Sequence, residues 1–123
     1  MNRSMDEKPV FDKADLMDRI DDDHLLAAEL AELFITDVKV KLASLQAAID
    51  NGIGSEIEKE AHSIKGAASN LSGQKVRHLA GSIETAGKNN DMSAVKAGMA
   101  ELVPAIDAFV DALYSQIIET APK

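Results

Sequence analysis

Four long stretches of this sequence repeat their apolar residues at helical spacing, and turn-forming residues separate one stretch from the next. Intervals of three and four residues place the apolar side chains of each stretch on one face of an α-helix. Because the connections are short, neighbouring helices are expected to run antiparallel. The sequence therefore predicts an all-α fold, an antiparallel up-down four-helix bundle with a short extra N-terminal helix. The four stretches are residues 24–51, 53–71, 76–87 and 92–117.

The short extra helix is predicted within residues 11–20, ahead of the bundle. Asp12 is suited to cap its N-terminus, and Asp15 would complement the helix dipole in the first turn. Its apolar residues Leu16 and Ile20 would pack on the bundle as a lid. We expect residues 1–10 to form a flexible tail and residues 11–120 to form one helical bundle domain.

The acidic run Asp21–Asp23 precedes the first long stretch. A calcium loop alternates its ligands and needs a glycine turn, which this run lacks. Aspartates at the start of a helix cap it and complement its dipole. We therefore interpret the run as a helix start, and no metal site is predicted.

The first long helix has an ambiguous core face. Leu33, Phe34 and Ile35 are consecutive, so they cannot all face the core. We expect Phe34 or Ile35 to be partly exposed. Such an apolar spot would belong either to a docking surface or to a broad core stripe. The heptad-like core stripe predicted for this helix is Leu26, Leu30, Leu33, Val38, Leu42, Leu45 and Ile49.

Two local features of the later helices are also predicted. Ser55 and Glu58 have the spacing of a capping box at the start of the second helix. Pro104 lies inside the last helix, where its ring crowds the carbonyl of Ala100. We expect a kink near Ala100.

Composition and charge exclude several kinds of function. The chain has 123 residues, with no cysteine and no tryptophan, which excludes disulfides, thiolate metal sites and thiol catalysis. Its net charge of −8 makes nucleic acids and anionic membrane surfaces poor partners. No apolar run approaches the roughly 20 residues that span a bilayer. We expect a cytoplasmic protein.

A polar face on the second helix carries the chemistry. Glu58, His62, Lys65 and Ser69 share this face, because residues three or four apart are neighbours on a helix. Gly66 lies one turn after His62, at a position where glycine costs about 1 kcal/mol relative to alanine. Helical side chains lean towards the N-terminus, so the absence of a Cβ there leaves the imidazole open to a large partner. An exposed imidazole beside a cation suits a nucleophile that accepts an anionic group such as phosphoryl.

The motif around this histidine resembles the signature of histidine-containing phosphotransfer (HPt) domains. It consists of the sequence His-Ser-Ile-Lys-Gly-Ala-Ala at residues 62–68, followed by Asn70 and Leu71. The resemblance continues through Leu79, Ile83 and Glu84 and extends loosely over residues 11–118. One departure is the order Ser-Gly at residues 72–73, where the family usually has glycine and then a small residue.

The resemblance implies a phosphorelay intermediate. Such domains take a phosphoryl group from the aspartate of a response-regulator receiver domain onto His Nε2 and pass it to another receiver, which supplies the Mg²⁺. The partners implied are receiver domains or a hybrid histidine kinase, and the domains are mostly monomers. Neither ATP binding, nor autokinase activity, nor a cofactor is expected, since the chain has no Gly-rich phosphate loop.

The residues implied for the site are His62 as phosphoacceptor, Lys65 as a phosphoryl contact and Gly66 as steric clearance. If the helical hairpin turns about Gly73, His62 and Glu84 lie eleven residues before and after it, at similar heights. Glu84 could then accept a hydrogen bond from Nδ1–H and leave Nε2 as the nucleophile. Alternatively, Glu84 is only a solvated acid.

Two other readings remain open. The bundle could be a docking module that binds receivers without transferring phosphate, in which case His62 is dispensable. It could also be the substrate domain of a chemotaxis-type histidine kinase, although no kinase region accompanies it. The remaining histidines, His24 and His78, are expected on the surface rather than as metal ligands.

Overall fold

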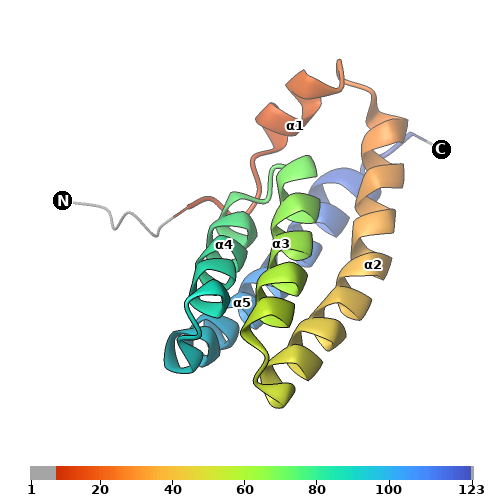
Figure 1. Cartoon of the computed structure of the whole chain (residues 1–123). Helices are drawn as coiled ribbons and strands as arrows, with labels where there is room; N and C mark the ends of the chain where they lie inside the picture. Colours follow the sequence, from red (N-terminus) through yellow and green to blue (C-terminus); the bar gives the residue numbers. More distant parts are fainter. Residues whose placement is uncertain (1–7, 123) are drawn as a thin grey trace.

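The computed structural model describes residues 8–122 and contains the predicted antiparallel bundle (Figure 1). Its four long helices are α2 (His24–Asn51), α3 (Gly54–Asn70), α4 (Gln74–Lys88) and α5 (Met92–Leu113). The short helix α1 (Lys13–Arg19) lies across one end of the bundle, and a π-helix, η1 (Tyr114–Ile118), extends α5. The all-α fold class is confirmed.

Aspartate caps and left-handed residues set the ends of these helices. The side chains of Asp12, Asp23 and Asp91 accept hydrogen bonds from backbone N–H groups at the starts of α1, α2 and α5. Asp23 thus confirms the helix-start reading of the acidic run. After α2, Gly52 adopts the left-handed conformation with φ of 65°, which ends the helix. Across residues 8–122, no group of three or more histidines or acids could hold a metal ion.

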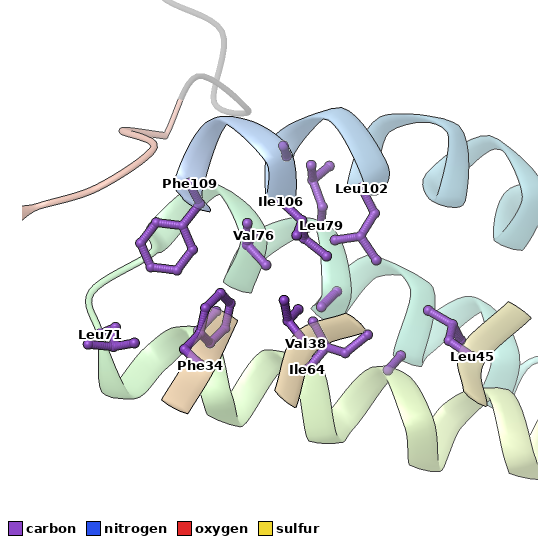
Figure 2. Packing of buried hydrophobic residues seen from close by; sticks show 14 of the residues in the cluster. Phe34, Val38, Leu45, Ile64, Leu71, Val76, Leu79, Leu102, Ile106 and Phe109 are labelled. Atoms are coloured by element: carbon purple, nitrogen blue, oxygen red, sulfur yellow. The ribbon is translucent and has the colours of Figure 1, made fainter. Parts of the chain in front are cut away.

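The core fills the space between the four long helices (Figure 2). Phe109 of α5 is fully buried, with its ring centroid 5.0 Å from that of Phe34 and 5.8 Å from that of Phe11. These rings form the aromatic centre of an otherwise aliphatic core. The apolar stripe of α3 is buried along its whole length, and it comprises Ile57, Ala61, Ile64, Ala68 and Leu71.

The predicted core face of α2 is wrong in its first half. Phe34 and Ile35 are both buried, whereas Leu33 is 62% exposed and Leu26 is 37% exposed. The buried residues are instead Ala27 and Ala31, in line with Phe34. The helix is rotated in this way because the ring of Phe34 packs against Phe109, and the small alanines let α2 approach the bundle closely. The side chains of Leu26 and Leu33 therefore face outwards.

The predicted capping box of α3 is also wrong. The N-cap of α3 is Ile53, without a side-chain hydrogen bond, and the helix begins at Gly54. The carbonyl of Ile53 already accepts hydrogen bonds from the N–H groups of Glu56 and Ile57 at 3.1 and 3.0 Å. Ser55 therefore lies inside the first turn and cannot act as the cap.

Helix α1 is fixed to the turn between α3 and α4. Leu16 is fully buried, and Ile20 packs against the core as part of the predicted lid. Arg19 Nη2 donates to Ser72 Oγ at 2.6 Å, and Ser72 Oγ in turn donates to Asp15 Oδ2 at 2.6 Å. This network explains how Ser72 is held in a left-handed conformation, with φ of 57°.

The N-terminal segment and the last helix complete the comparison with the predictions. Residues 1–7 of the predicted tail lie outside the described residues, whereas Val10 packs against the core. The proposed boundary after residue 10 therefore stays a prediction. Helix α5 continues through Pro104, and the kink near Ala100 stays a prediction. Within residues 8–122, no helix has both the length and the hydropathy needed to cross a membrane.

Candidate functional site

His62 lies in the middle of α3 and projects from the bundle, with 66% of its side chain exposed. Its neighbours Ala61 and Ile64 are fully buried, so the apolar stripe of α3 fixes the direction in which the imidazole points. The side chain of Glu84 on α4 meets the ring, with Glu84 Oε2 2.7 Å from His62 Nδ1. The hairpin about Gly73 thus brings the two residues together at the same height.

Glu84 is a constrained acceptor for this contact, because only 19% of its side chain is exposed. The hydrogen bond from Lys65, aided by that from His62, lowers the pKa of Glu84 below its ordinary value. The carboxylate is therefore ionised at neutral pH and can only accept hydrogen bonds. It follows that Nδ1 carries the proton and that the lone pair of His62 lies on Nε2, which faces away from Glu84.

Lys65 shares the same carboxylate. Its Nζ lies 2.6 Å from Glu84 Oε1, while His62 occupies Oε2. Glu84 therefore ties the imidazole and the ammonium together on one surface, and a third of the Lys65 side chain remains exposed. The hydroxyl of Ser69 donates to the carbonyl of Lys65 at 2.8 Å, so its role at this site is confined to the helix backbone.

Gly66 leaves a clear space beside the imidazole. A Cβ built at this position would have no atom of the surrounding structure within 4 Å. Packing within the bundle therefore gives no reason for a glycine here. This distinguishes it from Gly87, where a Cβ would lie 2.8 Å from Ile57 Cγ2.

The family model of the Hpt domain matches residues 29–116. The chain belongs to the Hpt domain family. Domains of this family transfer phosphoryl groups in two-component signalling, interact there with receiver domains, and act as phosphocarriers rather than as catalysts. No curated protein and no solved structure matches the chain. The matched segment includes α3 and α4 with the whole of the His62 site, and it begins within α2.

The other two histidines of this Hpt domain lie away from the His62–Glu84 pair. His24 is the first residue of α2 and is exposed. His78 lies on α4, almost two turns before Glu84, and is half-buried in a groove beside that helix. Within residues 8–122 the side chain of His62 pairs with Glu84, and no cluster of metal-binding residues includes His24 or His78.

Two features of this Hpt domain were not anticipated from its sequence. Lys41 of α2 donates a hydrogen bond of 2.6 Å to the hydroxyl of Ser63, the residue that follows His62 in α3. This hydrogen bond holds a second cation at the residue next to His62. A groove of about 670 Å³ also runs beside α4 from Lys65 to Lys8. The sequence feature that could have indicated this groove is the scarcity of acidic residues in α4, whose only acid is Glu84.

Proposed function

We propose that this Hpt domain is a phosphorelay intermediate with His62 as its phosphoacceptor. In this proposal, His62 takes a phosphoryl group from the aspartate of one receiver domain and passes it to the aspartate of another. The observation that carries the proposal is the pairing of His62 Nδ1 with the Glu84 carboxylate at 2.7 Å, which leaves an exposed Nε2. The open space at Gly66 gives a protein partner access to that atom.

The transfer step uses the lone pair on Nε2. This pair forms the new N–P bond, while the P–O bond to the receiver's aspartate breaks and its electrons leave with the carboxylate. The imidazole gains positive charge as the bond forms, and its remaining proton stays on Nδ1. The ionised carboxylate of Glu84 stabilises that charge and holds the ring in place. Attack on phosphorus by a second aspartate reverses the step and regenerates neutral His62.

Lys65 supports the phosphorylated state. Its ammonium lies one turn after His62 on the same face, where it balances the charge of Glu84 before transfer. A phosphoryl group on Nε2 adds a second anion to this face, and Lys65 would then lie between the two anions. We propose that Lys65 contacts the phosphoryl oxygens. Glu84 has a positioning role, because it orients both the imidazole and the ammonium.

The exposed apolar surface between α2 and α3 would form part of the receiver-binding face. Leu33 is 62% exposed and lines a small hollow together with Ala67, which follows Gly66 on α3. A partner that reaches Nε2 over Gly66 would cover this hollow and remove Leu33 from water. The phosphoryl group would come only from such a partner, and we propose that the chain itself neither binds ATP nor has autokinase activity.

A docking module without phosphotransfer is the second candidate function, favoured by the same exposed Leu33. The two functions differ in what they require of His62. If the chain is a docking module, substitution of His62 leaves the binding of a partner unchanged. If the chain is a phosphocarrier, the same substitution removes the atom that receives the phosphoryl group.

The deciding experiment is transfer from ³²P-labelled receiver domains of the same cell to the native chain and to His62→Gln. The matched control is His24→Gln, which removes an exposed histidine at the start of α2. The carrier predicts acid-labile, base-stable label on the native chain and on His24→Gln, and none on His62→Gln. Complex formation without label on any of the three chains would favour the docking module and refute the carrier.

A further inference from the structure

Charge is distributed very unevenly along this chain. Residues 61–88 contain four basic residues, Lys65, Lys75, Arg77 and Lys88, and a single acid, Glu84. The segment therefore has a net charge of +3, while the rest of the chain has −11 and the whole chain −8. The second half of α3 and the whole of α4 thus form a basic segment within an acidic protein.

The fold places two of these cations, Lys65 and Arg77, in one groove beside the His62 site, where Lys8 joins them. The groove has a volume of about 670 Å³, and none of the residues 8–122 that line it carries a carboxylate. Lys65 connects the groove to the pair formed by His62 and Glu84, because it lines the groove and its Nζ lies 2.6 Å from Glu84 Oε1. The lining residues are Lys8, Lys65, Gln74, Arg77, His78, Gly81, Ser82 and Thr85.

Two of the lining cations have no ion-pair partner within the part of the chain that the structure describes. The ion pairs among residues 8–122 involve Arg19, His62 and Lys65, and none of them involves Lys8 or Arg77. The side chain of Arg77 is also exposed. Arg77 can therefore form bidentate hydrogen bonds with a carboxylate of a partner without losing one inside the bundle.

We infer that this α4 groove binds an acidic surface of the receiver domain that exchanges phosphoryl with His62. The inference rests on the proposed function, and it adds the site that orients the partner. Because the groove joins the His62 site through Lys65, an acidic patch bound there would place the rest of the receiver over Nε2 and Gly66. The charges would also accelerate the encounter of the two proteins.

The charge of the remaining surface favours a protein over an extended polyanion. A nucleic acid or an anionic membrane would extend beyond the groove and meet the part of the chain that carries −11. At physiological ionic strength the Debye length is about 8 Å, so the groove acts on charges that come close to it. A compact acidic patch on a protein can enter this range without approaching the acidic remainder.

The test compares two double variants of equal net charge. Lys8→Glu with Arg77→Glu reverses two charges in the groove, whereas Lys39→Glu with Lys96→Glu reverses two exposed charges on α2 and α5. Association with a receiver of the same cell is followed by stopped-flow fluorescence, and phosphotransfer by ³²P label, at low and high salt. Thermal unfolding of each variant establishes that it is folded.

We expect the groove variant to associate at least ~10-fold more slowly than the control variant at low salt. The difference should shrink as salt screens the charges. Equal rates for the two double variants would overturn the inference, because net charge alone would then explain the effect. Native phosphotransfer by the groove variant, together with lost binding to phosphatidylserine vesicles or duplex DNA, would also overturn it.

A separate measurement keeps this inference distinct from the proposed function. Both double variants and the native chain are treated with phosphoramidate, a small phosphoryl donor that needs no docking. Equal labelling of all three, with a defect of the groove variant towards receivers only, supports the inference. A native chain that accepts label neither from receivers nor from phosphoramidate would refute the proposed function. A labelled native chain with no groove defect would refute only the inference.

Discussion

Replacement of Gly66 by alanine should improve the stability of the fold and impair its function. No atom of the surrounding structure lies within 4 Å of a Cβ at this position, so the added methyl group meets no steric resistance. Alanine is favoured over glycine in the interior of a helix by about 1 kcal/mol. For a domain of this size, such a gain raises the melting temperature by roughly 3–5 °C.

The same methyl group should hinder phosphotransfer between the chain and a receiver. A side chain at residue 66 covers the surface of the preceding turn, where His62 lies. A shift of about 1 Å in the approach of a reacting group can lower a rate roughly 10²-fold, so we expect transfer to fall by ~10–100-fold. Phosphoramidate is small enough to avoid the methyl group and should label the variant at the native rate.

The control for this prediction is Gly87→Ala on α4. A Cβ there would lie 2.8 Å from Ile57 Cγ2 and 3.0 Å from the backbone nitrogen of Glu58, so we expect a loss of about 1–3 kcal/mol. Calorimetry and the ³²P transfer assay together decide the outcome. A lower melting temperature for Gly66→Ala would refute the packing argument. A higher one with unchanged transfer from receivers would refute the role of Gly66 as steric clearance.

Three further predictions concern Glu84 and Leu16. Glu84→Gln should slow transfer from receivers by ~10–100-fold without unfolding the chain, because an amide can accept from Nδ1–H but cannot balance the imidazolium charge; an unchanged rate would contradict this. Since the pKa of Glu84 is lowered in the folded state, its stabilising contribution is complete above the ordinary value of 4.5 and is lost as pH falls through the folded value. Urea denaturation should therefore show the stability difference between the native chain and Glu84→Gln shrinking below about pH 4.5, and a difference that grows there would have the wrong sign. Leu16→Ala should cost about 2–5 kcal/mol in urea denaturation, because Leu16 is fully buried; a loss below ~1 kcal/mol would show that the lid is not part of the core.

The sequence predicts those parts of the fold that depend on local pattern. The aspartate caps at Asp12 and Asp23 are visible in the sequence because each satisfies backbone groups next to it in the chain. The contact between His62 and Glu84 is predictable from their equal spacing about Gly73, since antiparallel helices rise by the same length per residue.

Features that depend on packing between residues far apart in the chain could not be predicted from local sequence patterns. The rotation of α2 depends on the contact of Phe34 with Phe109, which lies 75 positions later in the chain, so the leucine pattern alone indicated the wrong face. The groove beside α4 combines Lys8 with α3 and α4, because Pro9 is held by a hydrogen bond from the N–H of Lys75. The sharing of Glu84 by Lys65 depends on side-chain conformations that spacing does not fix.

The central claim is that Nε2 of His62 receives the phosphoryl group while Nδ1 stays bound to Glu84. The most direct measurement is ¹⁵N and ³¹P NMR of the chain, labelled with ¹⁵N in its histidine rings and phosphorylated by a receiver. The account predicts phosphorus coupled to Nε2 of His62 and a protonated Nδ1. Phosphorus on Nδ1 of His62, or on either His24 or His78, would contradict it.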